Sequence, residues 1–452
     1  MSKNVKVVQS IQEKNKFWET NVVRMNQHEN NKERSDLAIY IDSTKEYQEW
    51  KGFGGAITEA AAYNLSKLSK EKRESILQAY YGKNGLGYTH GRVHINSSDF
   101  GLGNYDYIDE NDESLSTFSI EREEQYVLPI IREINQLTGD DLTLLASPWS
   151  PPAWMKTNGE MNNGGKLKKE YYPLWAKYFV KYIKEMRNKG IDIWAVTVQN
   201  EPAAKQVWDS CEYTGEEEKE FVKQLGEEFA KENLEDIKII IWDHNRDIIV
   251  ERADAVLNDP EARQYVWGVG NHWYVSEEFE NLSKVHEKYP EQHMIFTEGC
   301  IEGGVQLGAW HTGERYARNI IGDMNNWLEA FIDWNIVLDM QGGPNHVGNY
   351  CDAPIIVDPD QDVAHYNSSY YFIGHFSQYI KAGAKRTDLQ LEDQTLSATA
   401  FKNVDGSIVV VILNETNEQV TPSIHIDEST LTMPIPAHSI TTCIINEQVT
   451  EG

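Results

Sequence analysis

The sequence of 452 residues is poor in cysteine and in basic side chains. Its four cysteines form no CxxC pair, which excludes a disulfide framework and a zinc ribbon and makes reduced thiols the expected state. Lys and Arg number 42 against 71 Asp and Glu, which gives a formal net charge of −29. Such a charge repels phosphate backbones and anionic lipid surfaces, so we expect neither a nucleic-acid nor a membrane-surface partner.

Two further absences concern targeting. No apolar run reaches the roughly 18 residues of a membrane-spanning helix, so the sequence predicts no integral membrane segment. The first residues, MSKNVKVVQSIQEKNK, contain no apolar stretch of the kind found in secretory signals, and we therefore expect a cytosolic protein. The 13 Trp and 23 Tyr fit stacking on sugar rings, but they fit a large aromatic core equally well.

Eight short apolar runs recur along the middle of the chain, and most of them end in polar residues. Short runs rich in Val, Ile and Trp are typical of buried parallel strands. The runs cover residues 52–58, 91–96, 142–149, 193–202, 237–245, 267–274, 293–300 and 331–340.

The segments between most of these runs have the apolar periodicity of amphipathic helices. Residues 171–190 carry one apolar face that ends at Gly190, and Thr214 with Glu217 forms a capping-box pattern at the start of another helix. Strand followed by helix, eight times, predicts an α/β protein with a (β/α)8 TIM barrel. A doubly wound open sheet is the alternative, but no GxGxxG motif follows an early strand.

The two ends of the chain are β-rich instead. Residues 401–413 read as strand, turn and strand, with Asp405 and Gly406 in the turn. Because the two ends of a barrel lie close together, we predict that the β-rich ends pair with each other. The expected domains are a barrel over residues 51–381 and one small discontinuous β-sandwich built from residues 1–50 plus 382–452.

Two glutamates lie at the carboxyl ends of predicted strands, where barrels of this kind carry their working residues. Glu201 closes the fourth strand and Glu298 lies near the end of the seventh. These strands face each other across the barrel, so the two carboxylates can meet around one substrate. Two carboxyls that flank one bond are what glycoside hydrolysis requires. A single glutamate in so acidic a chain is more often solvated or ion-paired, and only the shared strand-end position favours catalysis.

Several motifs occur in the order in which glycoside hydrolase family 30 has them. They are GFGGAIT, LLASPWSPPAWMKTNG, WAVTVQNEP, HWY, FTEGC, DWN, GGPN and APIIVD. The chain resembles this family from about residue 52 into the C-terminal β region, and it is most similar to the glucosylceramidase (acid β-glucosidase) branch. The resemblance implies a TIM barrel with an attached β-sandwich and a retaining β-glycosidase that needs no cofactor.

The resemblance also implies roles for single residues. Glu201 of NEP would be the general acid/base and Glu298 of TEGC the nucleophile, with their carboxyls about 5–5.5 Å apart. Asn200 resembles the residue that binds the sugar 2-hydroxyl, and Tyr274 the tyrosine that hydrogen-bonds the nucleophile. Arg92 matches an arginine whose charge would keep the nucleophile ionised, and a purely structural pairing with a buried carboxylate is its alternative.

Further residues resemble those that line the sugar subsite. Trp149 of SPW and Trp334 of DWN would offer N–H donors and apolar surface, with simple packing as the alternative for both. Asn345 of GGPN is expected to bind substrate. Glu59 stands where the glucosylceramidase branch carries an Asp that contacts distant hydroxyls, and His346 stands in place of a Trp. These two differences leave the sugar and the aglycone open.

The remaining candidates have a structural interpretation. His272 is expected to orient a neighbour or to pack. His94, His272 and Asp243 lack a metal-ligand spacing such as HExxH, so we predict no metal site. Cys300, two residues after Glu298, is expected to be a small buried side chain and not a catalytic thiol.

The expected function is hydrolysis of β-linked glucosyl groups through a covalent glycosyl-enzyme intermediate, with exo action on small β-glycosides or oligosaccharides. An endo-acting β-1,6-glucanase, or a xylanase or xylosidase of the same family, is the alternative among enzymes. A catalytically silent carbohydrate-binding barrel is disfavoured, because both carboxylates are present.

Overall fold

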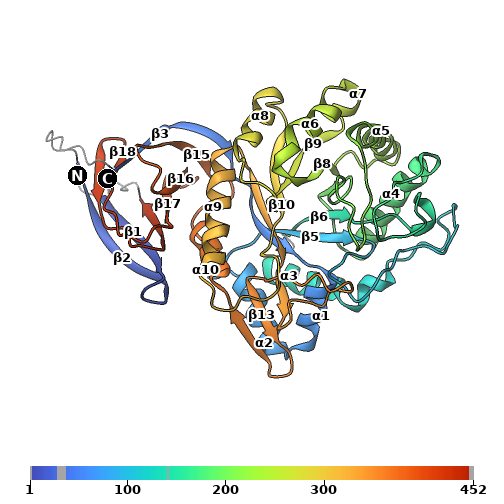
Figure 1. Ribbon diagram of the computed structural model, residues 1–452, viewed down its shortest axis with the longest axis horizontal. Helices are drawn as coiled ribbons and strands as arrows, with labels where there is room; N and C mark the ends of the chain where they lie inside the picture. The colour runs from blue at the N-terminus through green and yellow to red at the C-terminus, as the bar shows by residue number, and fades with distance from the viewer. Residues whose placement is uncertain (1–2, 28–36, 140–141, 447–452) are drawn as a thin grey trace.

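The computed structural model describes residues 3–27, 37–139 and 142–446, and its larger part is a closed barrel of eight parallel strands (Figure 1). The strands run in the order β10-β11-β4-β5-β6-β7-β8-β9, and β9 pairs with β10 to close the barrel. They are β4 (Gly52–Ala56), β5 (His90–Ile95), β6 (Thr143–Pro148), β7 (Ala195–Thr197), β8 (Lys238–Asn245), β9 (Val266–His272), β10 (His293–Glu298) and β11 (Ala330–Asn335). Each overlaps one of the eight predicted runs, so the predicted barrel is confirmed.

Helices follow the barrel strands, as the alternating sequence pattern predicts. They are α1 (Glu59–Lys67), α2 (Lys70–Tyr81), α3 (Val127–Thr138), α4 (Tyr172–Asn188), α5 (Gly215–Lys231), α6 (Ile249–Leu257), α7 (Pro260–Arg263), α8 (Glu280–Lys288), α9 (His311–Asn325) and α10 (Ser368–Ser377). Thr214 and Glu217 form the predicted capping box of α5. Gly190 follows α4 with a φ of +79°, which glycine adopts without steric cost.

One barrel strand is shorter than its apolar run. β7 ends at Thr197, whereas the run continues to residue 202. Glu201 has a φ of +49°, a left-handed conformation that ends extended structure and is uncommon outside glycine. Its backbone N–H still donates to the Asp243 carbonyl of β8, at 3.0 Å. Glu201 therefore lies in the loop after β7, fixed against the next strand, and does not close the strand as predicted.

A second sheet stands beside the barrel and combines both ends of the chain, seen as the blue and red strands of Figure 1. Its order is β1-β2-β19-β18-β3-β15-β16-β17-β20, and β20 pairs with β1, so the sheet closes around its own apolar core. The strands are β1 (Lys3–Ile11), β2 (Lys16–Gln27), β3 (Ala38–Glu49), β15 (Lys385–Leu391), β16 (Ser397–Lys402), β17 (Ile408–Asn414), β18 (Ser423–Ile426), β19 (Ser429–Thr432) and β20 (Ser439–Ile445). Residues 1–2, 28–36 and 447–452 of the predicted β-sandwich lie outside the described residues.

The barrel and the β-domain pack together along α10. His375 of this helix lies between the Ser10 hydroxyl of β1, at 2.8 Å, and the Thr442 hydroxyl of β20, at 2.9 Å. The indole N–H of Trp18 in β2 donates to the Tyr371 carbonyl at 2.9 Å. A short sheet of β12 (Val337–Asp339), β13 (Ile355–Asp358) and β14 (Val363–Tyr366) precedes α10. Within the described ranges, no helix is long and apolar enough to cross a membrane.

Candidate active site

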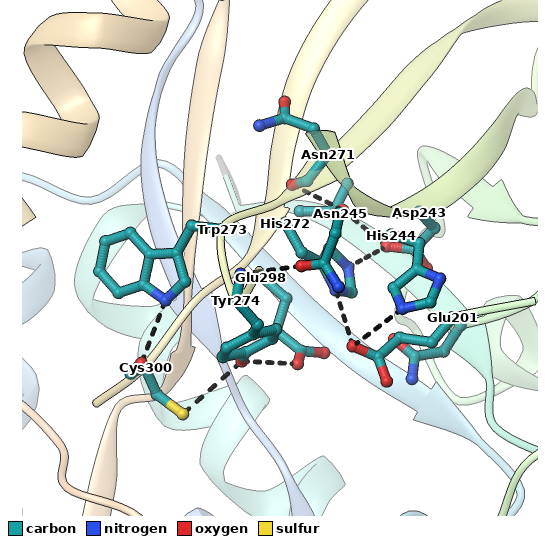
Figure 2. Close-up of polar contacts among 12 residues, drawn as sticks. Glu201, Asp243, His244, Asn245, Asn271, His272, Trp273, Tyr274, Glu298 and Cys300 are labelled. Carbon is teal, nitrogen blue, oxygen red and sulfur yellow. Dashed lines mark hydrogen bonds and ion pairs between the residues drawn. The ribbon is translucent and has the colours of Figure 1, made fainter. Parts of the chain in front are cut away.

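Glu201 and Glu298 meet at the carboxyl end of the barrel (Figure 2). Glu298 is the last residue of β10, and Glu201 lies in the loop after β7. One carboxylate oxygen of each and one ring nitrogen of His272 all lie within 4.8 Å of one another. Only 7% of the Glu298 side chain and 12% of the Glu201 side chain are exposed. The two carboxyl groups singled out from the strand ends therefore share one largely buried site.

Glu298 is held by two donors. Nη1 of Arg92 lies 2.6 Å from Oε2, and the Tyr274 hydroxyl donates to Oε1 at 2.9 Å. Burial raises the pKa of Glu298 above its ordinary value, His272 and Arg92 act in the opposite direction, and the charge of Glu201 adds to the rise. Arg92 thus favours the ionised carboxylate, as the resemblance implies, but its charge does not outweigh burial.

Arg92 of β5 joins several strand ends in one buried network. Its side chain is fully buried, and Nη2 donates to Asp243 Oδ2 at 2.7 Å and to Asn200 Oδ1 at 3.0 Å. Its Nε donates to the Ser147 hydroxyl at 3.1 Å. A buried guanidinium is tolerated only when charges and hydrogen bonds compensate it. Arg92 thus pairs with a buried aspartate and also contacts Glu298, and a role in keeping Glu298 ionised stays a prediction.

Glu201 faces two imidazoles. Nδ1 of His272 lies 3.3 Å from Oε1, and Nε2 of His244 lies 3.8 Å from the same oxygen. Burial raises the pKa of Glu201, but these two rings outweigh burial and lower the pKa below its ordinary value. Burial lowers the pKa of His272, whereas the carboxylates of Glu298, Asp243 and Glu201 raise it to about 9. His272 thus lies beside Glu201, where it can orient that carboxylate as predicted, and its surroundings favour the charged form of the ring.

Trp149 and Trp334 form one wall above the buried arginine. Their rings stack with centroids 5.2 Å apart and an interplanar angle of 22°. The guanidinium carbon of Arg92 lies 4.9 Å from the Trp149 ring and 5.6 Å from the Trp334 ring. Both indoles are almost fully buried, and neither N–H has an acceptor among the described residues. Each ring therefore packs against the network and keeps a donor free.

Glu59 and Asn345 make contacts of their own, outside this network. Arg122 Nε lies 2.8 Å from Oε1 of Glu59, and the Leu102 backbone N–H donates to Oε2 at 2.8 Å. The Asn345 amide donates to Asp99 Oδ2 at 3.0 Å, and its oxygen accepts two backbone N–H groups of its own turn. Contact of Glu59 or Asn345 with a substrate stays a prediction.

Asp99 is a candidate that the sequence reasoning did not single out. Its buried carboxylate accepts the amides of Asn345, at 3.0 Å, and Asn349, at 3.3 Å. Burial is the main cause that raises the pKa of Asp99 to about 7, and the charge of Glu298 contributes. The signal was present, because Asp99 lies four residues after the end of β5, where the strand-end rule applies.

The histidine and cysteine candidates also have defined places. His94 Nε2 accepts the Glu59 backbone N–H at 2.9 Å, so this ring is engaged away from His272 and Asp243. In the described part of the chain, Glu201, His272 and Glu298 are the group whose atoms are close enough to hold a cation. Hydrogen bonds from Arg92 and Tyr274 already hold Glu298 of this group. Cys300 is buried, as predicted, with its sulfur 3.6 Å from the Tyr274 hydroxyl.

The chain is similar in sequence and in structure to several known proteins. The lysosomal acid glucosylceramidase of Mus musculus is 35% identical over 410 residues, which cover 86% of this chain and 79% of that protein. The crystal structure of SrfJ from Salmonella typhimurium superposes with a TM-score of 0.94 at 32% identity, over 98% of this chain and 100% of that one. The endo-β1,6-glucanase BT3312 has a TM-score of 0.87 at 28% identity, over 98% and 100%.

Two family models match the chain. The model of the glycosyl hydrolase family 30 TIM-barrel domain matches residues 50–380, and that of the glycosyl hydrolase family 30 beta sandwich domain matches residues 383–443. The first alone covers most of the chain and contains both glutamates of the site. The chain therefore belongs to glycoside hydrolase family 30, as the resemblance of its motifs predicts.

Proposed function

We propose that this protein is a retaining β-glycosidase that removes β-linked glucosyl groups from small glycosides in the cytosol, as an exo-acting, glucosylceramidase-like enzyme. The supporting observation is the closeness of Glu201 and Glu298, which have carboxylate oxygens within 4.8 Å of each other. Retaining glycosidases hold their carboxyl groups about 5–5.5 Å apart, whereas inverting enzymes need about 6.5–9.5 Å to admit a water molecule. Facing oxygens this close agree with the shorter of these two separations, and they therefore support direct attack by a carboxylate.

In the first step, a Glu298 oxygen attacks the anomeric carbon, and the bond from that carbon to the departing oxygen breaks. The departing oxygen takes a proton from Glu201, so the aglycone leaves as an alcohol. Arg92 and Tyr274, at 2.6 and 2.9 Å, hold the attacking carboxylate in place. The product of this step is a glycosyl ester on Glu298.

In the second step, water attacks the anomeric carbon and loses a proton to Glu201, and the ester bond to Glu298 breaks. Asn200 is oriented for the sugar 2-hydroxyl, because Arg92 holds its amide oxygen at 3.0 Å and its NH2 group remains available. The free indole donors of Trp149 and Trp334 and the carboxyl of Asp99 are the further groups proposed to bind sugar hydroxyls.

The test of this function is hydrolysis of nitrophenyl β-D-glucoside, β-D-xyloside and β-D-fucoside, measured side by side. We expect the glucoside to have the highest kcat/KM, and NMR of the first product to show the β-anomer, because two displacements retain configuration. A clear preference for another sugar would overturn the proposed substrate and leave the mechanism in place. A first product in the α configuration would overturn retention.

Glu201→Ala is expected to lower kcat on nitrophenyl β-glucoside by on the order of 10²–10⁴-fold, because deglycosylation loses its general base. Added azide should restore part of the rate and give β-glucosyl azide, since azide attacks without a base. Steady-state rates with and without azide, together with product NMR, provide the measurement. Glu298→Ala is the matched comparison, and an equal loss in both variants without azide rescue of Glu201→Ala would contradict the assigned roles.

An endo-acting β-1,6-glucanase is the second candidate, favoured by the TM-score of 0.87 to the endo-β1,6-glucanase BT3312. An endo enzyme cuts inside a glucan and releases oligosaccharides from the start of the reaction. An exo enzyme releases one sugar at a time. Chromatography of early products from a long β-1,6-glucan distinguishes them, and early oligosaccharides without free glucose would favour the second candidate.

A further inference from the structure

Both ring nitrogens of His272 have polar partners, which simple packing does not require. Its Nε2 lies 2.8 Å from Asp243 Oδ1, and its Nδ1 lies 3.3 Å from Glu201 Oε1. The side chain is fully buried, and Figure 2 shows its ring between these two carboxylates. Both ring nitrogens therefore face an acid, and only one of those acids is proposed to take part in the reaction.

Asp243 keeps its charge and fixes one proton on His272. Besides the imidazole, its buried carboxylate accepts three other donors: Arg92 at 2.7 Å, the Thr197 hydroxyl at 2.7 Å and the Thr297 hydroxyl at 2.6 Å. Donors of this number and charge stabilise the ionised form. Nε2 then carries a hydrogen that points at Asp243. Nδ1, on the side of Glu201, is the ring position at which His272 can gain or lose a proton.

The charges around the ring favour a cationic imidazole. The groups that face His272 are Arg92 on β5, Glu201 after β7, Asp243 and His244 on β8, Tyr274 after β9 and Glu298 on β10. Three carboxylates against one guanidinium leave an excess of negative charge, and the pKa of His272 is accordingly about 9. The charged His272 ring also lowers the pKa of Glu201, so Glu201 alone does not hold a proton well at neutral pH.

We propose that His272 is a positioning residue that shares the acid proton of the reaction with Glu201, so that the proton delivered to the departing oxygen is held between His272 Nδ1 and Glu201 Oε1. This inference rests on the proposed glycosidase function and deepens it. As the glycosidic C–O bond breaks and Glu298 bonds to the anomeric carbon, the proton passes from Nδ1 through Glu201 to the departing oxygen, and His272 becomes neutral. When water attacks, its proton returns to the pair, and the ester electron pair returns to Glu298.

His272→Gln tests the proposal with two substrates, phenyl β-glucoside and 2,4-dinitrophenyl β-glucoside. The phenol needs a proton to leave and the dinitrophenol does not, so kcat/KM should fall by about 10²-fold or more on the first and by less than about threefold on the second. The alkaline limb of the pH profile on the phenyl substrate should lie near pH 9 in the unaltered enzyme, where His272 loses its proton. In the variant, this limb should move to lower pH, because Glu201 then holds the proton alone.

His293→Gln is the matched control. His293 also pairs with a carboxylate, at 2.7 Å from Glu329 Oε2, but it begins β10, whereas Glu298 ends that strand, so its ring lies away from Glu201. This variant should keep the ratio of the two kcat/KM values and the position of the alkaline limb. Equal losses on both substrates with an unmoved limb in His272→Gln would overturn the proposal and leave His272 a packing residue.

The unaltered enzyme provides a second readout if His272→Gln does not fold by circular dichroism. An alkaline limb of kcat/KM for phenyl β-glucoside below about pH 6, in the range of an ordinary carboxyl group, would overturn the shared proton without any variant. Failure of the proposed function looks different, because the unaltered enzyme would then hydrolyse no aryl β-glycoside. Normal turnover with azide rescue of Glu201→Ala, but without the His272 effects, would overturn only this inference.

Discussion

Glu298→Gln should abolish turnover of nitrophenyl β-glucoside, with a loss of kcat of roughly 10⁴-fold or more, the scale on which removal of a nucleophile acts. The amide keeps the size of the side chain but cannot form the glycosyl ester. Arg92 and Tyr274, which hold the carboxylate at 2.6 and 2.9 Å, would then face a neutral group. The measurement is the steady-state rate, with thermal unfolding followed in parallel to show that the variant is folded.

Glu302→Gln is the matched control for that variant. Glu302 follows β10 by four residues, but its side chain is 46% exposed and pairs with Arg315 on the surface. We expect its kcat to remain within about twofold of the unaltered enzyme, because exposed pairs contribute little. Residual turnover above one part in a hundred for a folded Glu298→Gln would mean that another group attacks the sugar.

Arg92→Leu is expected to lower the free energy of unfolding by about 3–5 kcal/mol, because it leaves the buried carboxylates of Asp243 and Glu298 without their cation. The two carboxylates lie 2.7 and 2.6 Å from the guanidinium, and the arginine side chain is fully buried. Activity should fall as well, since Glu298 and Asn200 lose the donor that orients them. Urea unfolding at neutral pH measures the stability change, and nitrophenyl β-glucoside hydrolysis measures the activity.

Arg73→Leu is the matched control for Arg92→Leu, because it removes an ordinary, partly exposed ion pair. Arg73 contacts Glu133 at 2.9 Å, but the two side chains are 19% and 32% exposed. A partly exposed pair contributes about 0–1 kcal/mol. Similar small losses in both variants would show that the charges around Arg92 do not stabilise the fold, and the network would then matter for catalysis alone.

The barrel was predictable because each strand is a short apolar run that can be buried only among others of its kind. The two glutamates were predictable for the same reason, since strand ends converge at one end of a barrel. The position of Glu201 was less so: the apolar run continues past Thr197, and only the left-handed φ of +49° takes this residue out of the strand. The pattern of apolar residues in the sequence does not reveal a backbone conformation of this kind.

Partners across the barrel could not be predicted. Asp243 and His272 come from β8 and β9, and which of their atoms face each other depends on strand register and side-chain rotamers. Asp99 was missed for a different reason, because it lies in the loop four residues after β5 and not at the strand end itself. Glu59 pairs with Arg122, and its contact with substrate stays a prediction. A strand-end rule applied to every loop residue would have included Asp99.

The pairing of β1 with β20 has a consequence for how the protein is made. Val7 lies opposite Cys443, so the first strand cannot gain this neighbour until almost the whole polypeptide has left the ribosome. Contacts so distant in sequence form slowly, because a long loop must close first. Until then, the unpaired edge of β1 is open to other chains, and loss of the last strand through a premature stop would expose that edge permanently and favour aggregation.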